Sequence, residues 1–248
     1  MLGIVVLALV SGLLIGCIGI GGVLLVPALT FLNVDVHRAI GASLFAFIFS
    51  GAIGAFVYTR KGSIDWASAI WLCAGATPGA LAGSIISSHI SGVILLLLIG
   101  ATVMFAGAQA LIRAPRAPSH RRRLSPPMLL AIGLVVGLAS ALTGTGGPVL
   151  LVPLLIWLRL PALISVGLSQ AIQVPIAIMA TAGNLWTGTV ELPLAALVSL
   201  GIVIGAWIGA RIAHALPALI LARVVAVALL ATGLLVMIRC GQTLAGPW

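Results

Sequence analysis

Long apolar stretches separated by short polar connections run along the whole chain. They cover residues 1–32, 41–58, 66–88, 93–112, 128–158, 166–182, 192–210 and 217–238. Each stretch approaches or exceeds the roughly 18 to 20 residues that a helix needs to cross a bilayer. A membrane β-barrel would instead alternate polar and apolar residues in short strands, and these stretches do not alternate. The pattern therefore predicts an all-α integral membrane protein.

Two of the stretches contain the same interruption. The first includes GIGGVLLVP at 19–27, and the second includes GTGGPVLLVP at 144–153. Glycine is unfavourable inside a helix, and proline removes a backbone donor and clashes with the preceding turn. An unbroken helix over 2–32 would also be about 46 Å long, well beyond the roughly 30 Å hydrocarbon core. We therefore predict that each stretch is a broken, re-entrant helical hairpin, with its longer arm before the glycines.

The two halves of the chain repeat each other at a spacing of 126 residues, as Pro27 and Pro153 show. The same spacing joins Asp65 to Glu191 and many glycines, namely Gly41 to Gly167, Gly62 to Gly188, Gly75 to Gly201, Gly79 to Gly205, Gly83 to Gly209 and Gly107 to Gly233. Three further spans follow each hairpin. We predict a first transmembrane repeat at 1–112, a basic linker at 113–127 and a second transmembrane repeat at 128–248, related by a pseudo-two-fold axis.

The direction of the second half depends on how the hairpins cross the membrane. Re-entrant hairpins give each half three crossings, so the halves are inverted. Arg60, Lys61, Arg159, Arg211 and the linker then share one side, with Arg38 and Arg239 on the other. Hairpins that cross once make the halves parallel and move Arg159 and Arg211 to the side of Arg38. The basic residues favour inversion by a small margin.

Charge is scarce and concentrated in the linker. Charged residues make up 6% of the chain, the net charge is +9, and five of the twelve basic residues are Arg113, Arg116 and Arg121 to Arg123. The positive-inside rule places the linker in the cytoplasm. We interpret the linker as a topology signal that contacts lipid headgroups and not nucleic acid. The three cysteines are isolated, which predicts no metal or redox centre.

The stretches that span the membrane contain almost no acidic residue that could hold a cation. The glycine interruptions leave backbone amides and the positive ends of short helices, which favour anions. The chain lacks the motifs of serine hydrolases, zinc proteases and P-loop ATPases, so we expect neither an enzyme nor a cofactor. The candidates for contact with a small anion are Gly19, Gly21, Gly22, Ser43, Thr143, Gly144, Thr145, Gly146, Gly147, Ser169, Gln170 and Gln173.

The three carboxylates lie in connections between stretches. Asp65 and Glu191 each follow a glycine by three residues and are more simply read as turn or helix-cap acids than as proton carriers. Asp35 with His37 and Arg38 forms the loop after the first hairpin, where a gate and a simple salt bridge are equally compatible with the sequence. These five residues are the candidates for gating or for coupling to a proton or another ion.

Small residues also form stripes along two stretches. Gly75, Gly79 and Gly83 repeat at four-residue spacing, as do Gly201, Gly205 and Gly209, so each row lines one helix face. Such stripes let helix backbones approach closely in membranes, and we predict this role for them. A sliding surface for alternating access is the alternative.

The two glycine motifs, the G-x-S sequences at 41–43 and 167–169, and KGSIDW at 61–66 together resemble the sulfite exporter TauE/SafE family, also called the 4-toluene sulfonate uptake permease family. The resemblance covers nearly the whole chain. It implies a duplicated inner-membrane permease for sulfite, an organosulfonate or a related sulfur-containing anion.

The repeat is imperfect near the glycine motifs, which implies an asymmetric site with more polar contacts from the second half. Thr143 and Thr145 replace Ile18 and Ile20, and Gln170 and Gln173 correspond to Leu44 and Phe47. We expect a secondary transporter that binds its anion near the midplane, between the two hairpins. An anion channel and a membrane scaffold that transports nothing remain as alternatives.

Overall fold

The computed structural model describes residues 2–18, 21–112, 124–212, 227 and 230–238. The helices are α1 (Leu2–Ile18), η1 (Gly21–Leu24), α2 (Leu25–Phe31), α3 (Val36–Arg60), α4 (Trp66–His89), α5 (Gly92–Ile112), α6 (Pro126–Thr143), α7 (Pro148–Trp157), α8 (Ala162–Trp186) and α9 (Leu192–Ile212). Residues 230–238 are also helical. Within the described part, five helices are long and apolar enough to cross a membrane. The predicted all-α architecture is confirmed.

Equivalent helices in the two halves begin at the spacing found in the sequence. α3 and α8 start and end 126 residues apart, and the first residues of α4 and α9 have the same separation. The turns before them also match. Asn33 and Arg159 have φ values of 60° and 67°, and Gly62 and Gly188 have φ values of 64° and 72°. The duplicated sequence therefore builds the same helices and the same left-handed turns in each half.

The first long apolar stretch is broken at its glycines. α1 ends at Ile18, the 3-10 turn η1 follows from Gly21, and α2 then begins; Gly19 lies outside the described residues. Pro27 falls in the first turn of α2, where a missing N–H has no partner to lose. A Cβ atom added to Gly3, near the start of α1, would lie 3.5 Å from Cδ1 of Leu32, just after α2. The hairpin therefore returns to the end of the molecule at which it starts.

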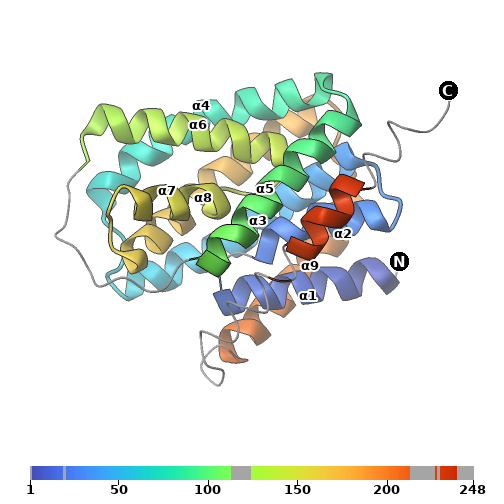
Figure 1. Ribbon diagram of the computed structural model, residues 1–248, viewed down its shortest axis with the longest axis horizontal. Helices are drawn as coiled ribbons and strands as arrows, with labels where there is room; N and C mark the ends of the chain where they lie inside the picture. The colour runs from blue at the N-terminus through green and yellow to red at the C-terminus, as the bar shows by residue number, and fades with distance from the viewer. Residues whose placement is uncertain (1, 19–20, 113–123, 213–226, 228–229, 239–248) are drawn as a thin grey trace.

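The second long stretch is broken in the same place. α6 ends at Thr143, Gly144 caps it in the left-handed conformation with φ 66°, and α7 begins at Pro148. Leu124 and Pro126 at the start of α6 line the same pocket as Leu160 and Pro161 after α7. This hairpin also returns to its starting end, and α7 doubles back beside α8 (Figure 1).

The two halves are interleaved rather than stacked side by side. α4 packs along α6, and α1 packs along α9, so each of these extensive interfaces joins one helix from each half (Figure 1). The glycine stripes lie at these interfaces. A Cβ on Gly79 or Gly83 would meet the backbone of Leu134 or Leu138, and one on Gly205 would meet the backbone of Leu9. The predicted role in close helix packing is confirmed for these glycines.

The equivalent helices α3 and α8 contact each other and run in opposite directions. Gly41 of α3 lies against Thr189, just after α8, Gly51 against Gln173, and Gly54 against Gln170. Contacts that advance along α3 therefore recede along α8. By the same test α4 and α6 run in parallel, because Gly75 approaches Leu130 and Gly83 approaches Leu138.

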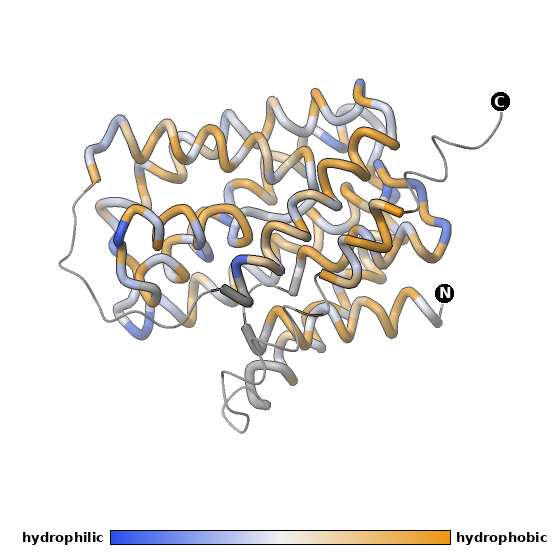
Figure 2. Tube along the Cα trace, in the orientation of Figure 1, coloured by the Kyte–Doolittle hydropathy of each residue, from blue (hydrophilic) through white to orange (hydrophobic). Residues whose placement is uncertain are grey.

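The apolar segments run along the long axis of the molecule. Figure 2 shows hydrophobic residues along the helices, whereas the most hydrophilic described segments lie mainly toward the two ends. Burial in the protein core does not account for all of these hydrophobic residues. Five of them are each more than half exposed, namely Phe56, Ile70, Val135, Leu200 and Trp207. Apolar surface of this extent on long helices indicates a multi-pass membrane protein.

Candidate functional site

The two glycine breaks meet at the ring of Phe47, in the middle of α3. A Cβ added to Gly22 would lie 2.7 Å from Cζ and 2.9 Å from Cε1 of this ring. A Cβ added to Gly146 would lie 2.7 Å from Cδ2 and 3.3 Å from Cε2. The two glycines therefore contact opposite edges of one ring, which is only 1% exposed. A side chain at either glycine would displace the ring.

A small void remains beside this ring, with a volume of about 10 Å³. It is lined by Ile15, Gly22, Phe47, Thr145, Pro148, Val149 and Gln173. Three of the residues predicted from the sequence, Gly22, Thr145 and Gln173, are therefore brought together from three separate segments. None of the described residues that line the void is charged. The volume is close to the minimum that one water molecule requires.

The second break owes its shape to three glycines in conformations that side chains disfavour. Gly144, Gly146 and Gly147 have φ values of 66°, 75° and 108°. Between them, the Thr145 backbone N–H donates a hydrogen bond to the carbonyl of Ser140 at 3.2 Å. The Thr145 hydroxyl lies 3.0 Å from the hydroxyl of Thr143. The glycines thus hold Thr145 against the void.

The two predicted glutamines lie on α8, and both are only 5% exposed. Gln173 Nε2 donates a hydrogen bond to Ser50 Oγ at 3.2 Å, which joins α8 to α3 beside the void. Gln170 packs against Gly54, one turn further along α3, and does not line the void. Of the two amides, only Gln173 therefore faces the junction of the breaks.

The paired serines, which were also predicted to contact the anion, lie away from the void. Ser43 Oγ donates to the carbonyl of Ala39, and Ser169 Oγ donates to the carbonyl of Val166, both at 2.7 Å. Both side chains are fully buried, and neither lines the void. Hydroxyls bonded to their own helix in this way are common in membrane spans.

The sequence analysis did not assign Phe47 to the site, although its repeat position carried a signal. Phe47 is the counterpart of Gln173 at the spacing of 126 residues. An aromatic residue at the repeat position of an amide, at the centre of a duplicated fold, indicates that the two halves contribute different chemistry there.

Among the described residues, three buried side chains have a polar atom without a hydrogen-bond partner, namely Ser140, Thr181 and Asn184.

At one end of the molecule, which is the ion-paired end, charged residues join the two halves. Arg38 Nη1 and Glu191 Oε2 lie 3.2 Å apart, and their side chains are 62% and 47% exposed. Asp35 is the N-cap of α3 and accepts hydrogen bonds from the backbone of His37 at 2.9 Å and of Arg38 at 3.3 Å. The ion pair joins the start of α3 to the residue just before α9. The loop predicted as a gate or a salt bridge therefore contains an ion pair between the two halves.

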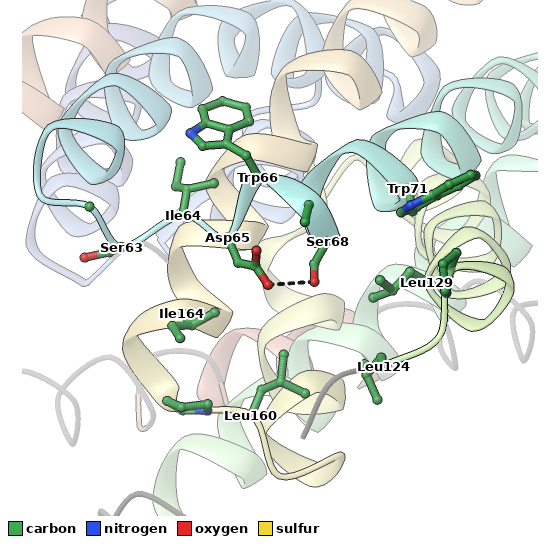
Figure 3. Close-up of a pocket in the computed structure, with 14 residues that line it drawn as sticks. Ser63, Ile64, Asp65, Trp66, Ser68, Trp71, Leu124, Leu129, Leu160 and Ile164 are labelled. Carbon is green, nitrogen blue, oxygen red and sulfur yellow. Dashed lines mark hydrogen bonds between the residues drawn. The ribbon is translucent and has the colours of Figure 1, made fainter. Parts of the chain in front are cut away.

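The opposite end is open. A pocket of about 480 Å³ lies there between the turn before α4, the start of α6 and the turn after α7. Figure 3 shows Asp65 in this pocket with its carboxylate hydrogen-bonded to Ser68, and Leu160 and Ile164 nearby. By the repeat, Asp65 corresponds to Glu191 and Ile164 corresponds to Arg38. The end that contains the pocket therefore lacks an equivalent of the arginine in the ion pair.

Asp65 lies directly before α4, as the cap-acid interpretation predicted. Its carboxylate accepts a hydrogen bond from Ser68 Oγ at 2.9 Å and does not bond the backbone of the first turn. Among the described residues, no group of three or more histidine, cysteine, aspartate or glutamate side chains could hold a metal ion.

The family model described as sulfite exporter TauE/SafE matches residues 4–236. The chain belongs to the sulfite exporter TauE/SafE family. Two TauE/SafE relatives come from Bacillus subtilis (strain 168). "Probable membrane transporter protein YdhB" is 28% identical over an alignment of 226 positions, which covers 88% of this chain and 92% of the relative. "Probable membrane transporter protein YunE" is 27% identical over an alignment of 241 positions, which covers 86% of this chain and 87% of the relative.

A "Probable membrane transporter protein" of Xylella fastidiosa (strain Temecula1) is 34% identical over 166 residues, 64% of each chain. No solved structure is similar enough to count as a match. The match to the TauE/SafE family model includes both glycine breaks and both ends described above. The residues at the junction of the breaks are therefore our candidate functional site in this TauE/SafE protein.

Proposed function

We propose that this protein is a secondary transporter of the inner membrane that moves a small anion, either sulfite, an organosulfonate or a related sulfur-containing anion. The anion binds between the two glycine breaks, and its release is coupled to the opening of one end and the closing of the other. The family name and the transporter names of the relatives support the general class.

The observation that carries the proposal is the meeting of two helix breaks, one from each half, at Phe47 and Gln173. Pro148 and Val149 of the first turn of α7 line the void, so the positive end of this short helix faces it. Thr145 and Gln173 add a hydroxyl and an amide. A site with these groups and no carboxylate among its described residues favours an anion over a cation.

We also propose that the two halves have inverted topology. The antiparallel contact between the equivalent helices α3 and α8 supports this arrangement, because equivalent spans in parallel repeats would run the same way. Arg60, Lys61 and Arg159 adjoin residues that line the open pocket, as does the end of the linker, whereas Arg38 lies at the ion-paired end. The positive-inside rule then makes the open end cytoplasmic.

The contrast between the two ends supports a carrier rather than a channel. A carrier exposes its site to one side at a time, whereas a channel requires a continuous pore. Here an ion pair joins the halves at one end, a pocket opens at the other, and the Phe47 ring fills the space between the breaks.

Flux measurements in proteoliposomes test the proposal. The purified protein is loaded into vesicles, and uptake of sulfite, sulfate, thiosulfate and sulfoacetate is measured with and without an imposed pH or sodium gradient. Saturable uptake that exchanges with unlabelled anion is the expected result. Ohmic anion current would indicate a channel, and absence of flux for the whole panel would favour the scaffold alternative.

A matched pair of glycine variants tests the placement of the site. Gly146 and Gly188 both adopt left-handed φ values, 75° and 72°, so alanine is strained at either position. A Cβ at Gly146 would strike the Phe47 ring, whereas a Cβ at Gly188 would have no atom within 4 Å. We expect Gly146→Ala to reduce flux by roughly tenfold, because a clash of this size costs about 1–3 kcal/mol. We expect flux through Gly188→Ala to remain near the wild-type rate. If both variants lost flux equally, the result would contradict the placement of the anion site between the glycine breaks.

A further inference from the structure

The void between the breaks is too small for the cargo proposed above. Its volume is about 10 Å³, enough for at most one water molecule. A sulfite ion has four non-hydrogen atoms, and an organosulfonate has more. The space that such an anion would need is occupied by a side chain, and the contacts identify which one.

Phe47 occupies this space. Its ring lies between Gly22 and Gly146 and contacts them with opposite edges. It comes from α3 rather than from either hairpin, so it enters the junction from the side. The ring is 1% exposed and belongs to the largest fully buried side chains of the described residues. The glycines leave room for this ring, and the ring in turn leaves no room for an anion.

Four of the other residues that line the void are less able to make room. Pro148 and Val149 are part of α7, and the Gln173 side chain is held by its hydrogen bond to Ser50 and by packing on Gly51. Thr145 sits between two left-handed glycines. A rotation of the Phe47 side chain would widen the void. Side-chain rotations are also much faster than rearrangements of helices.

We propose that Phe47 is an aromatic plug that occludes the anion site in this conformation and limits the size of the anion that the site accepts. The inference rests on the proposed function, and it adds a residue and a role that the glycine motifs do not contain. When the ring rotates away, Thr145, Gln173 and the first turn of α7 face the vacated space. When it returns, the ring fills the space between the breaks again.

The test uses a cysteine probe in the junction. Cys17, Cys73 and Cys240 are replaced by alanine, Thr145→Cys is introduced, and the protein is reconstituted in liposomes. The probe reagent is the negatively charged thiol reagent 2-sulfonatoethyl methanethiosulfonate, which carries a sulfonate group. We expect slow modification of Thr145→Cys with Phe47 present and modification roughly tenfold faster in the Phe47→Ala variant, with Phe47→Leu in between.

Two controls separate plug removal from general loosening. Phe49→Ala removes an aromatic ring from the same helix, but this ring is 42% exposed and lies outside the junction. We expect it to leave the labelling rate of Thr145→Cys unchanged. Ser199→Cys places a probe at a buried position on α9, away from the void. Its labelling rate should not respond to Phe47→Ala.

The proposal is overturned if Phe47→Ala leaves the labelling rate of Thr145→Cys within about twofold of its starting value, or if it accelerates Ser199→Cys equally. Transport provides a separate measurement. Phe47→Ala should raise the rate for benzenesulfonate relative to sulfite by roughly tenfold, because the enlarged site admits the bulkier anion. If the wild-type protein carries none of the anions of the flux panel, the proposed function fails, whereas the labelling rates still decide whether Phe47 occludes the junction.

Discussion

The close approach of α4 and α6 makes a quantitative prediction at Gly79. A Cβ added there would meet the carbonyl oxygen of Leu134 and would lie 3.0 Å from the carbonyl carbon and 3.1 Å from the Cα of the same residue. These are backbone atoms, which cannot rotate out of the way. Gly79→Ala therefore forces the two helices apart along an interface that also includes Gly75 and Gly83.

The magnitude follows from two opposing effects. Overpacking at a tight interface costs about 1–3 kcal/mol, and separation also weakens the dispersion contacts of the neighbouring glycines. Replacing glycine by alanine inside a helix contributes about 1 kcal/mol of stability. The clash involves three backbone atoms of one residue, so we expect the destabilisation to dominate. The net loss in free energy of unfolding should be about 1–2 kcal/mol.

Gly100→Ala is the matched control. Gly100 is also a buried glycine of a long apolar helix, but an added Cβ would meet side-chain atoms instead of backbone atoms: Sδ of Met237 at 3.1 Å, and Cγ of Met237 and Cγ1 of Val236, both at 3.3 Å. The methionine side chain is flexible and can move aside. We therefore expect Gly100→Ala to leave the free energy of unfolding unchanged or to raise it by up to about 1 kcal/mol.

Both variants are compared with wild type by reversible unfolding in mixed micelles, with helicity followed as the denaturing detergent increases. The reasoning fails if Gly79→Ala is as stable as wild type while Gly100→Ala behaves as expected. In that case α4 and α6 would not approach as closely as the glycine contacts indicate. A similar loss in both variants would mean that any added methyl group is harmful, whatever its neighbours.

Three further predictions concern the ends and the centre of the molecule. Arg38→Glu and Glu191→Arg should each reduce flux while changing the free energy of unfolding by less than about 1 kcal/mol, because the ion pair is exposed. The double variant should recover flux, and failure to recover would argue against a gate. Gly62→Ala, at φ 64° with no atom within 4 Å of the added Cβ, should lower the free energy of unfolding by about 1–2 kcal/mol. Gly62→Asn should lower it less, and equal losses would rule out backbone strain as the cause. A double-mutant cycle of Ser50→Ala and Gln173→Leu should give a coupling energy of roughly 0.6 kcal/mol, and zero coupling would contradict the hydrogen bond between them.

Much of the architecture was predictable from local sequence. The lengths of the apolar stretches predicted α3, α4, α5, α8 and α9, because a helix must span the hydrocarbon core whatever it packs against. The glycines predicted both breaks, since poor helix propensity acts within a single turn. The spacing of 126 residues predicted that equivalent helices would recur in order. The glycine stripes predicted close packing, although not which helices would pack together.

The site was only partly predictable, because it depends on how helices are rotated about their axes. Gly22, Thr145 and Gln173 were expected to meet and do meet at one void. Ser43 and Ser169 looked equally suitable but bond their own helices. A membrane helix that is apolar on every side has no periodic pattern of polar residues. Its sequence therefore does not show which side of the helix faces the site.

The sequence by itself determined that this chain is a duplicated set of membrane helices with two interruptions, because length, hydropathy and glycine content act within a few turns. Only the tertiary structure decided that Phe47 lies between the interruptions and that Arg38 pairs with Glu191. Arg38 and Glu191 are 153 residues apart in the chain. Such contacts depend on the antiparallel crossing of α3 and α8 and on the interleaving of the halves, and neither is encoded in any one segment.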